Sequence, residues 1–419
     1  MGKAVMAATI GCGLEFYDFV TFAFFAIQIG NTFFPSHDKY LSLMGSLATF
    51  GAGFLGRPVG AYVLGGLADR IGRRSIMLFS MMLMGGAIAV LALTPGYASI
   101  GIAAPIIAIL CRVTQGFALG GEIGAATVYM VEAADESRRA FSASWQGVCQ
   151  NVGASAGALA GFLLSLELSP DQLSSFGWRI ALLLGVCVVP FGLWMRRTIP
   201  ETLEAAQAPD SEVGSAAISI SRIAILGILI IGAGTIATYI FNYMATYAQN
   251  EMHLSTAAGM AGELIGNGVS IFACLAGGWL SDRYGRRPMQ VWPQLTFCLT
   301  IVPCFLWLTH VPTVGVFLTV NIILSILSTI WVPATYAAVA ENLDPSVRSR
   351  GFALIYSLPV TFLGGSTQLV VTWLLRVTGE PLSIAWYLTG ASVVGLVAML
   401  LLPESAPVRR GLKALSASA

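Results

Sequence analysis

The sequence is dominated by twelve apolar segments, each long enough to cross a lipid bilayer as a helix. A bilayer core requires about 20 apolar residues in an α-helix, and short polar breaks separate these segments. We therefore expect an all-α membrane protein with twelve transmembrane helices, located near residues 5–32, 42–67, 75–94, 99–131, 140–167, 178–197, 219–248, 256–281, 288–309, 313–341, 351–376 and 383–402.

The composition excludes most soluble classes of protein. Only 10% of the 419 residues are charged and 56% are hydrophobic, whereas a soluble domain carries roughly 25% charged residues. A water-soluble enzyme is therefore excluded, and the formal charge of +1 argues against nucleic acid as a partner. No GxxxxGK[ST] phosphate-binding loop is present and no cysteine belongs to a CxxC pair. We expect no enzymatic activity, no cofactor and no metal.

The chain divides into two similar halves. A polar stretch at 201–218 is the only long polar break in the interior, and we interpret it as a cytoplasmic linker between bundles at 1–200 and 219–419. The segment Gly65–Arg74 recurs 213 positions later as Gly278–Arg287. Six apolar segments fall in each half, and both copies of the repeat lie on the same side of the membrane. This pattern predicts parallel repeats related by a pseudo-two-fold axis along the membrane normal.

The distribution of basic residues indicates the orientation. With both termini cytoplasmic, seventeen of the 22 Lys and Arg residues fall on the cytoplasmic side and three on the outer side. Cytoplasmic loops of membrane proteins carry such an excess of Lys and Arg. We therefore expect both the N-terminus and the C-terminus in the cytoplasm.

Ionisable side chains inside the predicted spans mark a candidate site, because charges in hydrocarbon are costly and usually line a substrate or ion path. Glu15 and Asp18 share one helix face. A guanidinium binds carboxylates in a bidentate manner, and protonation of a carboxylate would release an arginine to bind an anion. This predicts proton-coupled binding of an anion, although the same charges would also suit a structural ion-pair cluster. The remaining members are Arg57 in the second span and Arg112, Gln115 and Glu122 in the fourth; Glu122 is a further proton-coupling candidate.

Polar side chains on other spans are candidate substrate ligands. Amides are costly against lipid, so Gln146 and Gln150 in the fifth span are expected to line a pocket. Glu263 and Asn267 share a face of the eighth span, which indicates packing or the lining of a cavity. The seventh span contributes candidates that would equally suit helix packing and interface anchoring, namely Tyr239, Asn242, Tyr243 and Tyr247.

The doubled loop G-x-L-[AS]-D-R-x-G-R-R resembles the signature of the major facilitator superfamily. Three further segments resemble its metabolite:proton symporter family, which includes carriers of citrate, α-ketoglutarate, shikimate and proline or betaine: Leu14–Phe19 (LEFYDF), Gly56–Gly60 (GRPVG) and Arg112–Glu122 (RVTQGFALGGE). The sequence Ser-Trp-Gln at 144–146, followed by Gln150, is most similar to the citrate and tricarballylate branch. The seventh span departs from the family pattern Tyr-x-Pro-Thr-Tyr, because it reads Tyr-Met-Ala-Thr-Tyr without the proline.

The resemblance implies a monomeric carrier in the bacterial inner membrane that imports an organic acid with protons by alternating access. A di- or tricarboxylate such as citrate or tricarballylate is the implied substrate, and Asp18 with Arg112 is the implied coupling pair. The repeated loops are implied to gate the cytoplasmic side through Asp69, Arg70, Arg73, Arg74, Asp282, Arg283, Arg286 and Arg287.

Four alternatives stay open. A symporter of a zwitterion such as betaine or proline, or of a shikimate-like monocarboxylate, would suit the mixed charges. A proton-coupled exporter and a substrate-sensing receptor on a transporter scaffold are further alternatives.

Overall fold

The computed structural model describes residues 13, 16–71, 73–120, 123–132, 134–197, 217–344 and 348–408. No strand occurs among them. In the first half, a helical stretch at 16–24 precedes α2 (Ala26–Phe33), α3 (Lys39–Ile71), α4 (Arg73–Leu93), α5 (Tyr97–Ile100), α6 (Ala103–Leu119), α7 (Ile123–Glu132), η1 (Glu136–Arg138), α8 (Arg139–Glu167), α9 (Pro170–Gln172), η2 (Leu173–Gly177) and α10 (Trp178–Arg197).

The second half is also helical throughout its described elements. It consists of α11 (Ala217–Phe241), α12 (Met244–Asn250), α13 (Thr256–Tyr284), α14 (Arg286–His310), α15 (Val314–Thr329), α16 (Val332–Asn342), α17 (Arg348–Pro359), η4 (Val360–Gly364), α18 (Gly365–Thr378) and α19 (Leu382–Leu401).

The helices account for every predicted span. Each of the twelve apolar segments contains helix. In the described part of the chain, seven helical stretches are long and apolar enough to cross a membrane, and 78–93 and 103–119 are shorter apolar helices. The expectation of an all-helical membrane protein is confirmed. The division at 201–218 stays a prediction, because 198–216 lie outside the described residues.

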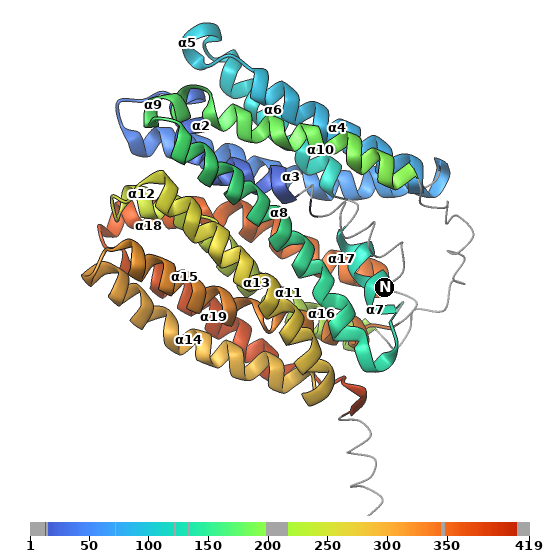
Figure 1. Ribbon diagram of the computed structural model, residues 1–419. Helices are drawn as coiled ribbons and strands as arrows, with labels where there is room; N and C mark the ends of the chain where they lie inside the picture. The colour runs from blue at the N-terminus through green and yellow to red at the C-terminus, as the bar shows by residue number, and fades with distance from the viewer. Residues whose placement is uncertain are drawn as a thin grey trace, which may run out of the picture.

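The two halves meet along α8 and α13. In Figure 1 these helices run side by side through the middle of the molecule, with α4, α6 and α10 on one side and α14, α15 and α19 on the other. Small residues permit the close approach: a Cβ atom built on Gly278 of α13 would lie 2.8 Å from the carbonyl oxygen of Ala140. One built on Gly161 of α8 would lie 2.8 Å from the sulfur of Met260. Glycines commonly bring membrane helices together in this way.

Some long helices are interrupted inside the bundle. The α11–α12 helix is broken at Asn242–Tyr243, and the α15–α16 helix at Ile330–Trp331. Irregular backbone is tolerated at membrane depth where it is enclosed by protein or lines a cavity. Asn242 and Trp331 both line the cavity described next, so the interruptions locate the candidate site.

Candidate functional site

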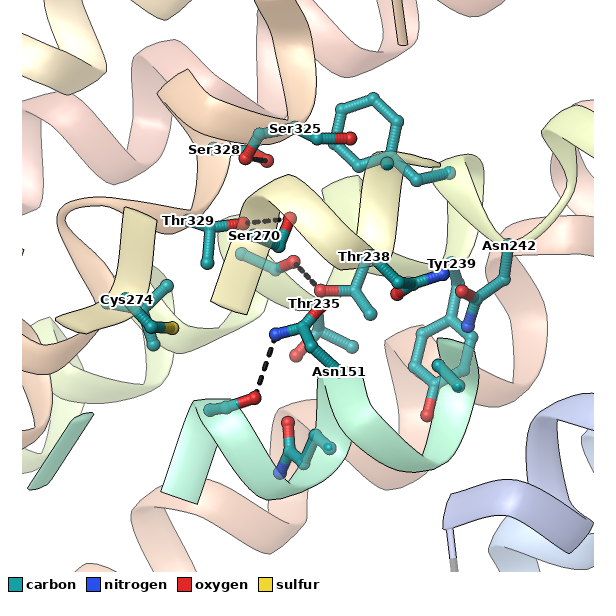
Figure 2. Close-up of a pocket in the computed structure, with 18 of the residues that line it drawn as sticks. Asn151, Thr235, Thr238, Tyr239, Asn242, Ser270, Cys274, Ser325, Ser328 and Thr329 are labelled. Carbon is teal, nitrogen blue, oxygen red and sulfur yellow. Dashed lines mark hydrogen bonds between the residues drawn. The ribbon is translucent and has the colours of Figure 1, made fainter. Parts of the chain in front are cut away.

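A cavity of about 140 Å³ lies between α8 of the first half and α11, α13, α15 and α16 of the second. Many neutral polar side chains contribute to its lining, as Figure 2 shows. Many of its hydroxyls bond within the protein: the Thr235 hydroxyl donates to the carbonyl of Ile231 at 2.7 Å, and that of Thr329 donates to the Ser270 hydroxyl at 3.2 Å. Labelled polar side chains around this space are Asn151, Thr235, Thr238, Tyr239, Asn242, Ser270, Ser325, Ser328 and Thr329.

Three of the predicted substrate ligands line this cavity. Gln150 reaches it from α8, Tyr239 from α11, and Asn242 from the break between α11 and α12. The amide Nε2 of Gln150 donates to the hydroxyl of Tyr356 on α17 at 3.3 Å, so the two halves are joined by a hydrogen bond at the cavity wall. The cavity therefore contains groups from both halves, as a carrier that alternates between two openings requires.

The predicted arginines lie beside the cavity, enclosed by aromatic rings. The guanidinium carbons of Arg57 and Arg112 are 4.6 Å and 4.4 Å from the centre of the same Phe19 ring. Arg112 has no exposed surface. Cation–π contacts partly compensate for the loss of water around each cation. The other rings in contact are Phe54 with Arg57, and Phe22 and Phe50 with Arg112.

The hydrogen-bonding capacity of Arg112 is only partly used. Its Nη1 donates to Oε1 of Gln115 at 2.6 Å, whereas Nε and Nη2 have no hydrogen-bond partner. Buried donors without partners are costly and rare. The site can therefore supply a guanidinium edge to a carboxylate that enters it.

Tyr239 connects the arginines to the cavity. Its hydroxyl interacts with the guanidinium of Arg57 through a side-chain hydrogen bond, and its ring lies 5.2 Å from that of Phe54 and 5.9 Å from that of Phe50. The same residue lines the cavity. Tyr239 thus lies between the cationic groups of the first half and the cavity, and it touches both.

Asp18 is buried close to Arg112 without forming an ion pair with it. Its side chain is 4% exposed, and its Oδ1 atom has no hydrogen-bond partner. Asp18 and Arg112 interact electrostatically. The carboxylate fits against Gly185 on α10, where a Cβ atom would lie 1.6 Å from Oδ1. Since the two side chains form neither a hydrogen bond nor an ion pair with each other, the coupling role of this pair stays a prediction.

The other predicted residues are dispersed. Gln146 is buried on α8 outside the cavity lining. Tyr243 is hydrogen-bonded to Thr372 at 3.2 Å and Tyr247 packs on Phe305, both also outside the lining. Their substrate roles therefore stay predictions. The proton-coupling candidates Glu15 and Glu122 lie outside the described residues.

The repeated loop of the second half joins the two halves at one end of the bundle. Asp282, near the C-terminus of α13, accepts hydrogen bonds from the backbone N–H groups of Ala140 (3.0 Å) and Phe141 (2.8 Å). These groups belong to the first turn of α8, where the helix dipole favours a negative charge. We call this end, formed by the C-terminus of α13 and the N-termini of α8 and α14, the loop end.

A charge network surrounds Asp282. Arg286 is buried and pairs with Asp282 at 2.6 Å and with Glu341 at 2.8 Å. Glu404 accepts from the backbone N–H groups of Arg286 and Arg287, both at 3.0 Å, at the start of α14. The guanidinium of Arg287 donates to the carbonyl of Leu400. The network fixes the position of Asp282 opposite α8.

The remaining loop residues have different surroundings. Arg283 lies over the rings of Trp279 and Tyr284 of its own helix. Arg348 pairs with Glu132 across the two halves at 3.1 Å. The first copy of the loop is at the junction of α3 and α4, and the side chains of Asp69, Arg70, Arg73 and Arg74 lie outside the described part.

The family model described as Major Facilitator Superfamily matches residues 19–358. The chain belongs to this superfamily. It is 37% identical to the citrate-proton symporter of Salmonella typhi over 95% of this chain and 93% of that protein. It is 34% identical to the citrate-proton symporter of Klebsiella pneumoniae over 94% of this chain and 90% of that protein. The chain is accordingly a multi-pass membrane protein.

Solved structures of the superfamily have the same fold. A crystal structure of the D-xylose-proton symporter superposes with a TM-score of 0.75 over 97% of this chain and 98% of that chain, at 16% sequence identity.

Some features of the candidate site could not be predicted from the sequence. The phenylalanines around the arginines resemble lipid-facing residues until the fold brings them together. Nothing in the apolar sequence around Gly185 distinguishes it from other glycines of the predicted spans. A signal did exist for Glu341 and Arg348, because they repeat Glu132 and Arg139 at a spacing of 209 residues, but the repeat does not reveal their partners.

Proposed function

We propose that this superfamily member is a proton-coupled symporter that imports a di- or tricarboxylate such as citrate by alternating access. The observation that carries the proposal is the pair of buried arginines, Arg57 and Arg112, on one phenylalanine ring beside a polar cavity between the halves. The similarity to two proteins named citrate-proton symporters supports this choice of substrate.

Substrate binding follows from the unused donors. A carboxylate entering from the cavity would meet Tyr239 first and would then compete with its hydroxyl for Arg57. A second carboxylate would satisfy the Nε and Nη2 donors of Arg112. Two guanidinium groups suit a substrate that carries at least two carboxylates, since each offers a planar, bidentate edge.

Proton coupling follows from the charge balance. Among the described residues, Asp18 is the carboxylate that interacts with Arg112. A proton on Asp18 removes its attraction to the guanidinium, so the cationic site then holds the anionic substrate more strongly. Proton and anion therefore bind together, which is the requirement for symport.

Alternating access requires that the loop end open and close. The Asp282 contact to α8 closes this end, which we assign to the cytoplasmic side from the excess of Lys and Arg in the sequence. Release of Asp282 from the α8 N-terminus would separate the halves there and let the substrate leave to the cytoplasm.

The test is transport by the purified full chain in proteoliposomes. We expect wild type to accumulate labelled citrate when a proton gradient is imposed, and Asp18→Asn to lose this accumulation while it retains citrate exchange at equal pH. The matched control is Asp171→Asn, on an exposed residue of α9. Normal accumulation by the Asp18 variant would refute the coupling role.

A competitor panel tests the substrate. Tricarballylate should compete strongly with citrate, and shikimate, which has one carboxylate, should compete weakly. Stronger competition by betaine than by tricarballylate would replace the proposal with a zwitterion symporter.

A further inference from the structure

Glu263 on α13 is the only charged side chain among the described residues that line the cavity. It is 4% exposed, and its Oε1 atom has no hydrogen-bond partner. Glu263 lines the cavity, whereas Asp18, Arg57 and Arg112 do not. The proposed mechanism makes no use of this carboxylate.

The contacts of α13 place neutral amides around Glu263. Gly262 packs against Phe317 of α15, and Gly266 packs against Ser325, so Asn321 lies between these two contact points at the level of Glu263. Asn321 lines the cavity, as does Asn267 one turn from Glu263. Each of these amides already donates one N–H to a carbonyl of its own helix, at 2.9 Å and 2.8 Å respectively.

No described cation faces Glu263. The uncharged titratable groups on α13 and the elements around it are Cys149 of α8, Tyr239 of α11, Tyr243 directly before α12, Tyr247 of α12, Cys274 and Tyr284 of α13, Cys298 and Cys304 of α14, Tyr336 of α16 and Tyr356 of α17. The charged and histidine side chains on the elements packed against α13 lie toward the ends of those elements, and none of them interacts with Glu263: Glu136, Arg138, Arg139, Glu167, Glu251, His253, Arg286, Arg287, His310 and Glu341.

A buried carboxylate requires a counter-charge, and a cation or a proton can provide it. Since no described cation reaches Glu263, the counter-charge that the site admits is a proton on the carboxylate. Water that enters the cavity when one end opens can deliver this proton to the carboxylate, and water at the other end can accept it. The net step moves one proton across the membrane and leaves the carboxyl group unchanged.

We infer that Glu263 is a second proton-binding site, located in the second half, that is loaded from outside and unloaded to the cytoplasm in each transport cycle. The inference rests on the proposed function. A tricarboxylate brings up to three negative charges, and each charge that is not compensated moves against the interior-negative membrane potential. A single proton on Asp18 leaves most of that charge uncompensated, so a second site serves this substrate class.

The test compares wild type with Glu263→Gln, Glu263→Asp and the control Glu251→Gln, which makes the same change at an exposed residue outside the cavity. Proton and labelled citrate fluxes are measured together in proteoliposomes. We expect Glu263→Gln to carry one proton fewer per citrate and to lose part of the pH dependence of exchange. Glu263→Asp should restore both, and Glu251→Gln should match wild type.

Several results would overturn the inference. These are an unchanged proton-to-citrate ratio and pH profile in Glu263→Gln, a dependence on sodium that this substitution removes, and loss of citrate exchange in a folded Glu263→Gln protein. The last result would make Glu263 a substrate ligand.

An infrared measurement tests Glu263 independently of transport and of the proposed substrate. Wild type should show a carboxylic-acid C=O band, sensitive to pH, that is absent from Glu263→Gln and unchanged in Glu251→Gln. Identical bands in wild type and Glu263→Gln would overturn the inference. If wild type transports none of the tested substrates but shows the band, the proposed function fails and the proton site stands.

Discussion

Replacing Asp282 by Asn tests the contact that closes the loop end. In the structure, the two carboxylate oxygens accept from the first-turn N–H groups of Ala140 and Phe141, at 3.0 Å and 2.8 Å. Asn keeps the shape of the side chain and one of these acceptors. It turns the other oxygen into a donor that faces an N–H group, and it removes the charge that interacts with the α8 dipole.

The size of the destabilisation of the closed loop end follows from the lost hydrogen-bond acceptor and the lost charge. Loss of a side-chain cap at a helix N-terminus costs about 0.5–2 kcal/mol, and loss of a charge near the dipole costs about 0.3–1 kcal/mol. Arg286 retains Glu341 as a partner at 2.8 Å, so its positive charge stays compensated. We expect the closed loop end to be destabilised by about 1–2 kcal/mol, which is about a five- to thirtyfold change in the ratio of closed to open molecules.

The assay is a distance measurement between two spin labels, at Glu136 in the first half and at Tyr284 in the second, both exposed at the loop end. The native cysteines are replaced beforehand. In Asp282→Asn the distance distribution should shift toward longer, open separations, and the rate of citrate uptake should change. The control is Arg283→Gln, because Arg283 lies over the ring of Trp279 on its own helix. A distribution identical to that of the parent would refute the reasoning.

Three other predictions follow from individual contacts. Gly185→Ala places a Cβ atom 1.6 Å from Oδ1 of Asp18, so proton-driven uptake should fall sharply. Gly86→Ala is the control, because Gly86 has open space around it, and it should leave uptake unchanged. Equal uptake by the two variants would show that close packing of Asp18 against Gly185 is not needed for transport. Arg348→Gln removes the partly exposed ion pair with Glu132 at 3.1 Å. It should lower the free energy of unfolding by less than about 1 kcal/mol, and a large drop in melting temperature would contradict this. Tyr239→Phe keeps the ring contacts but removes the hydroxyl that competes with citrate for Arg57. The apparent affinity for citrate should therefore rise while the maximal rate of uptake stays similar. An unchanged affinity would show that the hydroxyl does not compete with substrate.

The helices could be predicted from the sequence because a bilayer fixes their length and hydropathy. The repeat predicts that its two copies lie on one side of the membrane, and this stays a prediction. Asp282 of the second copy lies at the α8 N-terminus, where the helix dipole favours its charge. The partners of these loop residues could not be predicted. Arg286 has Glu341 as its second partner, 55 residues away, and hydropathy carries no information about such pairs.

The position of the cavity was harder to predict than the charges. The strongest sequence signals, Arg57 and Arg112, are in the first half, whereas most of the lining comes from α11, α13 and α15 of the second half. Serine and threonine side chains on those helices bond to their own backbone, as Thr235 does. They therefore occur in any membrane helix at little cost, and they give no signal until the fold shows which of them face the same space.

The separation of the arginines from the cavity has a consequence for transport. A carrier must bind its substrate well enough to load it and weakly enough to release it, so groups that bind a polyanion strongly should be available in only part of the cycle. Phe19, Phe50 and Phe54 cover the guanidinium groups, and Tyr239 stands between them and the cavity. A substrate that reached both arginines would have to displace these rings, and the free energy used for the displacement weakens its binding. In the proposed mechanism, covering the arginines with rings therefore favours turnover over tight retention of the anion.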